Sequence, residues 1–323
     1  MVSDTRRLLS AKAEKSFLND FSRAFEVAEN PGGVAHKVTF VLIERGHDPC
    51  GFRRVFHPCL TSSNVREARL LDMRDDLFVH WLEALQRRHL ATLTFPEVRR
   101  AVQALSSLYV ERRGRIDSGS PLSGAGKRAA FAMYFGPLHF LLVREIVRSL
   151  QAKIPRNAGI VDLGCGTGVA GAAWSLECDE PHRLDGVDRS PWVLQECRWT
   201  YEQFGLHGTA RSADIGSIRI PPGTAVIAAF TMNELDRARR DRFRRDLIQT
   251  ARNGAPVLIV EPIARRLTSW WDDWAGEWTT IGGRHDEWRF RLEVPEPLAL
   301  MDKAAGLNHR EFTGRSLWLP GLA

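Results

Sequence analysis

Short apolar runs alternate with longer amphipathic segments through the second half of the chain. The runs predict buried strands, and they begin at Ile160, Leu184, Thr209, Ala225 and Ala255. Helical spacing of apolar residues predicts helices between them, over residues 129–150, 191–204 and 237–252. Strands that alternate with helices in this way predict an α/β fold with a mostly parallel sheet.

The last part of the chain changes this pattern. We predict a strand over residues 288–294, a helix over 297–306 and two closing strands over 309–312 and 316–319. A hairpin at the end of a β-α series predicts that the last strand runs antiparallel to the others.

The first part of the chain has helical spacing without clear strand runs. We predict helices over residues 4–29, over 34–44, from 61–64 to 89 and over 96–113. Glycine and serine interrupt the pattern over residues 114–126, so the domain boundary is placed between 126 and 127. The prediction is an all-helical domain over residues 1–126, serving as a lid, a dimerisation element or a substrate-binding element, and a catalytic domain over residues 127–323.

A glycine-rich turn follows the first apolar run of the second half. Ile160 and Val161 lead into Asp162, and glycine then occupies alternate positions 164, 166 and 168. Glycine tolerates positive φ and has no side chain, so such a turn can bring its backbone against a ligand. The helix predicted after it would direct unpaired N–H groups at the same ligand.

A carboxylate closes the second apolar run. Asp188 ends the segment Leu184–Asp188, where a carboxylate can accept both hydroxyls of a ribose. Nicotinamide and flavin enzymes use a similar turn, so a nicotinamide enzyme is the main alternative. Two features favour another cofactor: Asp162 stands where dinucleotide sites carry an apolar residue, and the late glycine of G-x-G-x-x-G is missing.

The pattern DLGCGTG with Asp188 resembles the cofactor loop of class I S-adenosylmethionine-dependent methyltransferases. This resemblance covers about residues 129–323 and implies a Rossmann-like seven-stranded sheet, with S-adenosylmethionine as cofactor. In that family an acidic residue after the third strand, here Asp214, accepts the adenine amino group, and its apolar neighbour Ile215 covers the ring. The implied cofactor-binding residues are Asp162, Gly164, Cys165, Gly166, Gly168, Asp188, Arg189, Asp214, Ile215 and Thr231.

A narrower similarity is to the ribosomal small-subunit methyltransferase-like family. It rests on residues 134–137 (YFGP), on residues 168–174, and on an NEL turn followed later by VEP. The chain departs from that family because it lacks the cysteine cluster after the fifth strand: no cysteine follows Cys197.

Polar residues follow the fourth apolar run, at the edge where open parallel sheets bind ligands. Asn233 and Glu234 are therefore the predicted catalytic residues, positioning the acceptor and, for some acceptors, removing a proton. Glu234 could instead simply begin the next helix. Glu261 and His285 are weaker candidates.

Aromatic residues raise two further possibilities near the predicted site. Tyr134 and His139 could form one wall of the cofactor pocket, although core packing is the simpler role. Tryptophans recur with helical spacing over residues 270–278; they could pack in the core or stack on a flat acceptor.

Charge and cysteine content narrow the choice of partners. The net charge is +6, and arginine pairs recur at 53–54, 87–88, 99–100 and 112–113, which indicates either solvated helix faces or a phosphate-binding surface. The five cysteines include no C-x-x-C pair, which favours reduced thiols and no metal site. No signal-type leader or membrane-spanning run is present, so we expect a cytoplasmic protein without a membrane partner.

Three functions are consistent with these observations. The first is methyl transfer to RNA or a ribonucleoprotein, including a ribosomal partner. The second is methyl transfer to oxygen or nitrogen of a small metabolite or natural product, with a homodimer as a possible assembly. The third is S-adenosylmethionine binding by an assembly factor without turnover.

Overall fold

The computed structural model describes residues 25–28, 39–45, 52–56, 62–111, 122–263, 269–307, 309 and 311–322. These residues divide into two compact units, Met1–Asp75 and Asp76–Ala323. The predicted boundary between residues 126 and 127 falls within helix α4, Ala125–Ala130.

The first unit contains a small antiparallel sheet. Its strands are β1 (Phe25–Ala28), β2 (Thr39–Arg45) and β3 (Phe52–Phe56), in the order β1-β2-β3. Strands therefore stand where an all-helical domain was predicted, and that prediction is wrong for these residues. Phenylalanine, valine and isoleucine dominate β2 between Thr39 and Arg45, and such side chains favour extended backbone. The rest of the helix predicted over residues 4–29 lies outside the described residues.

Helices precede the sheet of the second unit. They are the part of α2 (Ser62–His89) that follows Asp75, α3 (Phe95–Glu111), α4, the π-helical turn η1 (Phe131–Phe135) and α5 (Gly136–Leu150). Thr94 and Glu97 begin α3 with a local cap, since the Glu97 Oε2 accepts from the Thr94 N–H at 2.7 Å. The helix predicted over residues 129–150 is thus present, and it starts earlier at Ala125.

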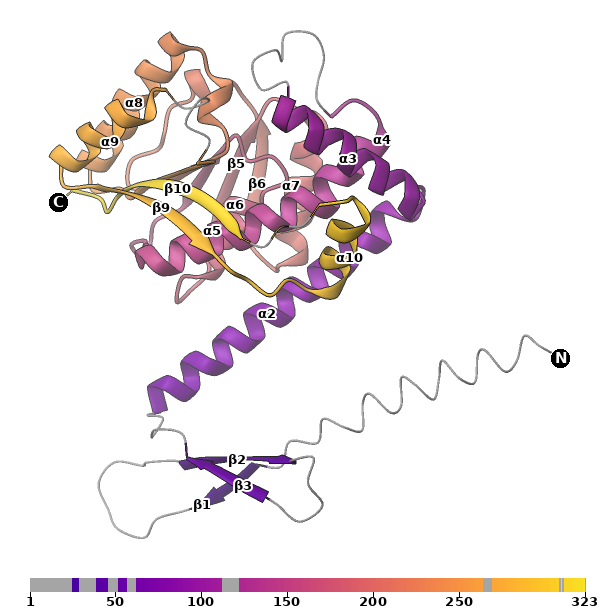
Figure 1. The fold of residues 1–323 in the computed structure, drawn as a ribbon. Coiled ribbons are helices and arrows are strands. Elements are labelled where there is room, and N and C mark those ends of the chain that lie inside the picture. Colours follow the sequence, from indigo (N-terminus) through magenta and orange to yellow (C-terminus); the bar gives the residue numbers. More distant parts are fainter. Residues whose placement is uncertain are drawn as a thin grey trace, which may run out of the picture. The chain divides into compact units, whose positions relative to one another are not determined.

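Seven strands form one mixed sheet in the second unit (Figure 1). They are β4 (Ile160–Leu163), β5 (Leu184–Asp188), β6 (Gly208–Ser212), β7 (Ala225–Ala229), β8 (Val257–Glu261), β9 (Arg284–Phe290) and β10 (Phe312–Leu319). The strand order is β6-β5-β4-β7-β8-β10-β9. Strands β4 to β8 pair in parallel, and β10 is antiparallel to both β8 and β9. The predicted α/β fold with an antiparallel last strand is therefore confirmed.

Apolar side chains cover both faces of this sheet. On one face, α2, α3, α5, α6 (Val169–Leu176) and α7 (Pro191–Gln203) contribute to a single buried cluster with residues such as Trp81, Phe140 and Trp174. On the other, α8 (Arg237–Arg252) and α9 (Trp271–Thr280) bury Phe243 and Trp274. Buried packing thus accounts for most of the tryptophan-rich stretch.

The end of the chain differs from the prediction. Instead of two closing strands over residues 309–312 and 316–319, one strand, β10, runs from Phe312 to Leu319. Its antiparallel neighbour β9 precedes helix α10 (Glu296–Ala304) and ends at Phe290 rather than Val294. Gly314 lies inside β10, where a Cβ would approach Leu142 Cδ2 to 3.1 Å. Glycine here permits close packing rather than a bend.

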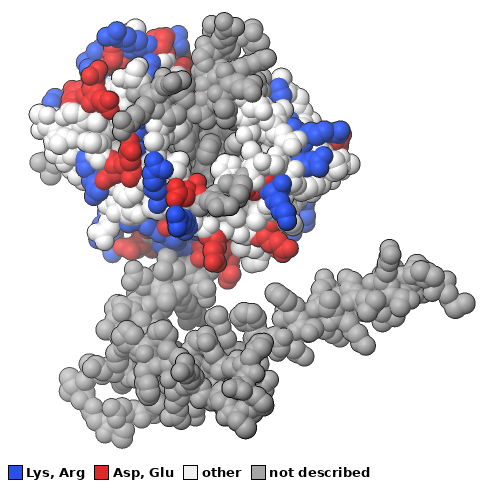
Figure 2. All heavy atoms as spheres, in the orientation of Figure 1, with Lys and Arg blue, Asp and Glu red and all other residues white. Residues whose placement is uncertain are grey.

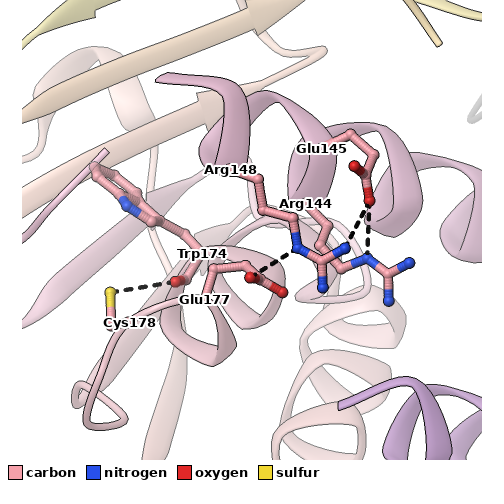
Figure 3. A network of polar contacts seen from close by, with 6 residues as sticks. All are labelled: Arg144, Glu145, Arg148, Trp174, Glu177 and Cys178. Atoms are coloured by element: carbon pink, nitrogen blue, oxygen red, sulfur yellow. Dashed lines mark hydrogen bonds and ion pairs between the residues drawn. The ribbon is translucent and has the colours of Figure 1, made fainter. Parts of the chain in front are cut away.

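Polar contacts fasten α5 to the end of α6 (Figure 3). The Arg148 Nε donates to Glu177 Oε2 at 2.9 Å, and its Nη1 donates to Glu145 Oε1 at 3.0 Å. On the other side of the same helix end, Trp174 Nε1 donates to the Ala152 carbonyl at 2.7 Å. These bonds fix α6, and α6 begins directly at the glycine turn.

The stretch Ala125–Leu150 has the length and hydropathy of a membrane span, yet 72% of its most apolar window is buried inside the unit. This burial is typical of a core helix. Length and apolar composition alone are weak evidence for a membrane segment.

Candidate functional site

The glycine turn adopts the backbone that its sequence predicts. Gly164, Gly166 and Gly168 all have positive φ, at 67°, 50° and 80°. A Cβ on Gly164 would lie 2.3 Å from Thr231 Oγ1, and one on Gly168 would lie 2.8 Å from Cys197 Sγ. At Gly166 the nearest atoms belong to the Phe131 ring, 3.8 Å away. Two glycines are therefore required by close packing, while the third borders more open space.

Asp162 ties the turn to the helix that follows. It is buried, and its Oδ2 accepts from the Gly171 N–H in α6 at 2.8 Å. Burial raises the pKa of Asp162 to about 7; the Gly171 bond lowers it and the charge of Asp188 raises it. Its Oδ1 is buried without a hydrogen-bond partner among the described residues. Asp162 thus holds β4 against α6, and a direct cofactor contact stays a prediction.

Asp188 joins strand β5 to the glycine turn. Its Oδ2 accepts from the Gly166 N–H at 3.2 Å, and its Oδ1 accepts from the Ser190 N–H at 2.9 Å. The Gly164 N–H also donates to the Val187 carbonyl at 2.8 Å. The structure therefore brings Asp188 and the glycine turn together at one edge of the sheet.

Asp214 and Ile215 stand at the end of the neighbouring strand. The Ala213 N–H donates to the Asp188 carbonyl at 3.2 Å, which sets the ends of β5 and β6 side by side. The Asp214 Oδ1 caps the short helix η2 (Ile215–Ser217) by accepting from the Gly216 N–H at 3.0 Å. Its Oδ2 pairs with Arg239 at 3.3 Å, and Ile215 is buried.

Cys165 and Arg189, both predicted as cofactor-binding residues, differ from each other in burial. The Cys165 side chain is buried and interacts with Cys197, while its N–H donates to the Val187 carbonyl at 3.0 Å. Cys165 therefore contributes packing and backbone to the turn. Arg189 is exposed directly after β5.

Strand β7 meets the glycine turn through Thr231. Its Oγ1 lies 3.0 Å from the Ala229 carbonyl oxygen and 3.3 Å from that of Gly164. The preceding residue, Phe230, has φ of 58°, which a residue with a side chain rarely adopts. Its ring stacks on His139 with centroids 4.0 Å apart, and burial lowers the pKa of His139 to about 4. His139 is therefore a neutral packing partner of the strand end.

Tyr134 does not serve the site with its hydroxyl. That group donates to Asp302 of α10 and lies 2.9 Å from the His309 Nδ1. Tyr134 is fully buried, so it packs η1 against α10. Core packing, the simpler of its two predicted roles, accounts for these contacts.

Asn233 belongs to a network of three side chains. In the short helix η3 (Met232–Glu234), Asn233 donates through Nδ2 to Glu261 Oε2 at 2.7 Å and accepts at Oδ1 from Trp270 Nε1 at 3.0 Å. Glu261 also accepts from the Met232 N–H at 2.8 Å. Glu261 is completely buried, and burial raises its pKa to about 8. Both polar groups of the Asn233 amide are thus engaged within the protein.

Glu234 ends η3, and its side chain is exposed. Partial desolvation by its surroundings raises the pKa of Glu234 even though the side chain is exposed; the charge of Asp188 raises it further, and Arg189 lowers it. His285, in contrast, is exposed on β9, and β8 and β10 separate that edge strand from β7. The structure does not bring His285 to the site, so that weaker prediction is wrong.

A pocket of about 290 Å³ lies next to this network, and the prediction from sequence missed it. We name it the arginine–tryptophan pocket; its lining residues are Arg237, Arg240, Asp241, Arg244, Ser269, Trp270, Asp273 and Trp274. The available signal was the run RARRDRFRR at 237–245, directly after the NEL turn. The sequence predicted a helix here, and its basic residues were given no role in a site.

Comparisons with known proteins give one family match and several distant relatives. Residues 160–254 match a family described as "Methyltransferase domain". Carboxy-S-adenosyl-L-methionine synthase of Yersinia pestis is 29% identical over 108 residues, 32% of this chain and 40% of that protein. The chain thus spans about two fifths of the length of the curated relatives it matches.

Solved structures with a related fold include two methyltransferases. One is the tRNA (uracil-54, C5)-methyltransferase of Pyrococcus abyssi in complex with S-adenosyl-L-homocysteine, with a TM-score of 0.36 and 13% identity over 55% of this chain and 37% of that one. Another, from Aquifex aeolicus, has a TM-score of 0.34 and 14% identity over 55% of this chain and 87% of that one.

Proposed function

We propose that this chain, which belongs to the class I superfamily of S-adenosylmethionine-dependent methyltransferases, transfers a methyl group to a small-molecule acceptor. The observation that carries the proposal is the shared edge of the sheet. Hydrogen bonds join the ends of β5 and β6 and tie the glycine turn to β5, and Thr231 lies against the same turn. Open parallel sheets bind their ligands at this edge.

The residues at this edge suit S-adenosylmethionine. The Gly166 backbone has only the Phe131 ring near it, at 3.8 Å, and Asp188 would accept the ribose hydroxyls. Asp214 would accept the adenine amino group beside the apolar Ile215. The cofactor supplies an electrophilic methyl group on a sulfonium, so the chain's main task is to align the acceptor.

We assign different roles to the two predicted catalytic residues. Glu234 is the proposed general base, because a carboxylate with a raised pKa accepts a proton more readily near neutral pH. Asn233 is a positioning residue, because Glu261 and Trp270 already engage both ends of its amide. It fixes η3, and η3 carries Glu234.

The arginine pairs give less support to an RNA acceptor than the sequence suggested. Arg88 pairs with Glu196 at 2.9 Å and lies over the Trp199 ring at 4.9 Å, while Arg87 pairs with Glu83 at 3.6 Å. Figure 2 shows basic and acidic residues interspersed on the visible face of the described residues. A phosphate-binding surface would favour a continuous basic patch. The compact pocket beside Asn233 instead favours a small acceptor.

Calorimetry with S-adenosylmethionine, followed by a labelled-methyl assay against cell metabolites and total RNA, tests the proposal. We expect cofactor binding and label transfer to the metabolite fraction. Label in RNA alone would contradict the small-molecule acceptor and support the RNA hypothesis. Cofactor binding without transfer to either fraction would support a non-catalytic binding role.

A further inference from the structure

The arginine–tryptophan pocket lies between the first turns of two helices. Arg237 and Arg240 belong to the first turn of α8, and Ser269, Trp270 and Asp273 surround the start of α9. Trp270 also donates to Asn233, so the pocket adjoins the network that fixes η3. The two helix N-termini add partial positive charge at this place. A ligand in the pocket would therefore sit beside the proposed acceptor site.

Arg240 is the residue that sets the charge of the pocket. Its Nη2 donates to the Leu235 carbonyl at 3.0 Å, and its guanidinium lies over the Trp270 ring at 5.4 Å. No ion pair joins Arg240 to a carboxylate within the part of the chain that the structure describes. Burial lowers the pKa of Arg240, although Asp241, Glu261 and Asp236 oppose this effect. A partly desolvated cation of this kind gains most from an anionic ligand.

The other charges of the pocket are largely balanced. Arg237 lies 3.9 Å from Asp241, and Arg244 pairs through Nη1 with Glu277 at 3.0 Å. The Arg244 Nε is buried without a hydrogen-bond partner among the described residues, so it is not accessible to a ligand. Asp273 is exposed and opposes anion binding in part. The arrangement leaves Arg240 as the cation for a ligand, rather than a broad basic surface.

The walls of the pocket limit what can enter. Trp270 and Trp274 supply apolar surface, and the volume of about 290 Å³ is close to the lower end of ordinary ligand pockets. A single ring or a short chain fits this size. A polymer would have to lie outside it.

We propose that the arginine–tryptophan pocket binds an oxyanion of a small organic ligand, a carboxylate or a phosphate, with Arg240 as its counter-ion. The inference rests on the proposed function in one respect: the ligand is the methyl acceptor, and its anionic group anchors it beside Glu234. Arginine suits this role because its planar fork donates two parallel hydrogen bonds to a carboxylate or phosphate.

Calorimetry on the full chain without cofactor tests the pocket directly. The probes are benzoate, phenyl phosphate and benzamide, which share a ring and differ in the attached group. We expect at least one anion to bind about tenfold more tightly than neutral benzamide, as a charge-assisted hydrogen bond predicts. Comparing the two anions tells which source of negative charge the pocket prefers.

Substitutions in α8 assign the effect to a residue. Arg240→Gln should weaken binding of the preferred anion about tenfold, and Arg240→Lys should retain part of the affinity because it keeps the charge. Arg245→Gln is the matched control, since Arg245 is an exposed arginine of the same helix that does not line the pocket. Melting temperatures of all variants check that the fold is retained.

Three outcomes would overturn the proposal. They are no anion binding by the wild type at millimolar concentration, equal binding of benzoate, phenyl phosphate and benzamide, and equal losses in the Arg240→Gln and Arg245→Gln variants. S-adenosylmethionine titrated into the same samples keeps the two ideas separate. Oxyanion binding without cofactor binding would defeat the methyl-transfer proposal alone, and the reverse would defeat the pocket alone.

Discussion

The proposed ligand-binding edge of the sheet has two halves, and they present different chemical groups. On the side of β4, β5 and β6, the glycine turn presents backbone, and the Asp188 carboxylate is held by two backbone N–H groups. On the side of β7 and β8, long side chains hold one another: Trp270, Asn233 and Glu261 form a chain of hydrogen bonds. In the proposed site the backbone half would recognise the cofactor, which is constant, while the side chains of the other half could be exchanged to suit different acceptors.

This difference also affects how each half responds to mutation. Glycine positions with positive φ tolerate almost no side chain. Substitution of a glycine in the backbone half should therefore cause a large loss of stability or ligand binding. In the side-chain half, removal of one member leaves its partners buried and unpaired, which costs a defined amount of stability. The following predictions test this contrast.

The largest effect is expected from Asp188→Ala. Loss of the carboxylate removes the proposed ribose acceptor and frees the Gly166 N–H, so cofactor affinity should fall about 100-fold or more. Titration calorimetry with S-adenosylmethionine measures it. Asp185→Ala is the control, because Asp185 lies on the same strand and contacts Arg211 at the surface. Equal affinities in the Asp188 variant and the wild type would refute the assignment of the cofactor site.

Gly164→Ala should be the next most damaging change. A Cβ here would lie 2.3 Å from Thr231 Oγ1 at φ of 67°. Gly223→Ala provides a matched control, because Gly223 has φ of 69° with no atom within 4 Å. Gly164→Ala should lose about 1–3 kcal/mol more unfolding free energy than Gly223→Ala, the usual cost of overpacking. Chemical denaturation measures both, and similar losses would show that the clash is relieved cheaply.

Asn233→Ala tests the side-chain half. The change leaves Glu261 Oε2 and Trp270 Nε1 without their partner, so stability should fall by about 1–2 kcal/mol. Turnover should slow while cofactor affinity stays within about twofold, because the cofactor half is untouched. Asn253→Ala, which removes an exposed contact with Gln249, is the control. A large loss of cofactor affinity in the Asn233 variant would mean that the two halves are not separable.

The smallest effect concerns pH. The pKa of Asp162 is raised by burial to about 7, so the folded state holds a proton that the unfolded state has lost. This contribution to stability is complete below the unfolded pKa and is lost as pH rises through about 7. Between pH 6 and 7 we expect stability to fall by about 1 kcal/mol from this group. Asp162→Asn should flatten the melting profile over that range, and an unchanged slope would assign the effect elsewhere, such as to Glu261.

Much of the sheet could be predicted because its signals are local. The strand Leu184–Asp188 and the helix Arg237–Arg252 have the bounds expected from their apolar patterns. The π-helical turn over residues 131–135 and the uninterrupted β10 could not be predicted, since tertiary packing decides both. In the first unit, the strand Thr39–Arg45 was taken for a helix because a short apolar run fits either period.

The residues of the candidate site also divide into those that the sequence predicted and those that it missed. Gly164, Gly166 and Gly168 were found because one short segment contains the whole turn. The Asn233 network was not foreseen, since Glu261 is 28 positions and Trp270 is 37 positions away along the chain. Arg240 was missed for a related reason: its proposed role depends on contact with Trp270, which is distant along the chain.

The number of residues in the π-helical turn η1 determines which side chains face the glycine turn. A π turn holds one residue more than a regular helical turn, which shifts the helical phase by about 100°. This shift allows Phe131 to lie against Gly166 while Tyr134 reaches α10. Deleting one residue between 131 and 135 would restore a regular helix and turn the ring at 131 away from the cofactor edge. A change in the number of residues at this point would therefore change which side chain lies against the glycine turn, without any change in the sequence of the turn itself.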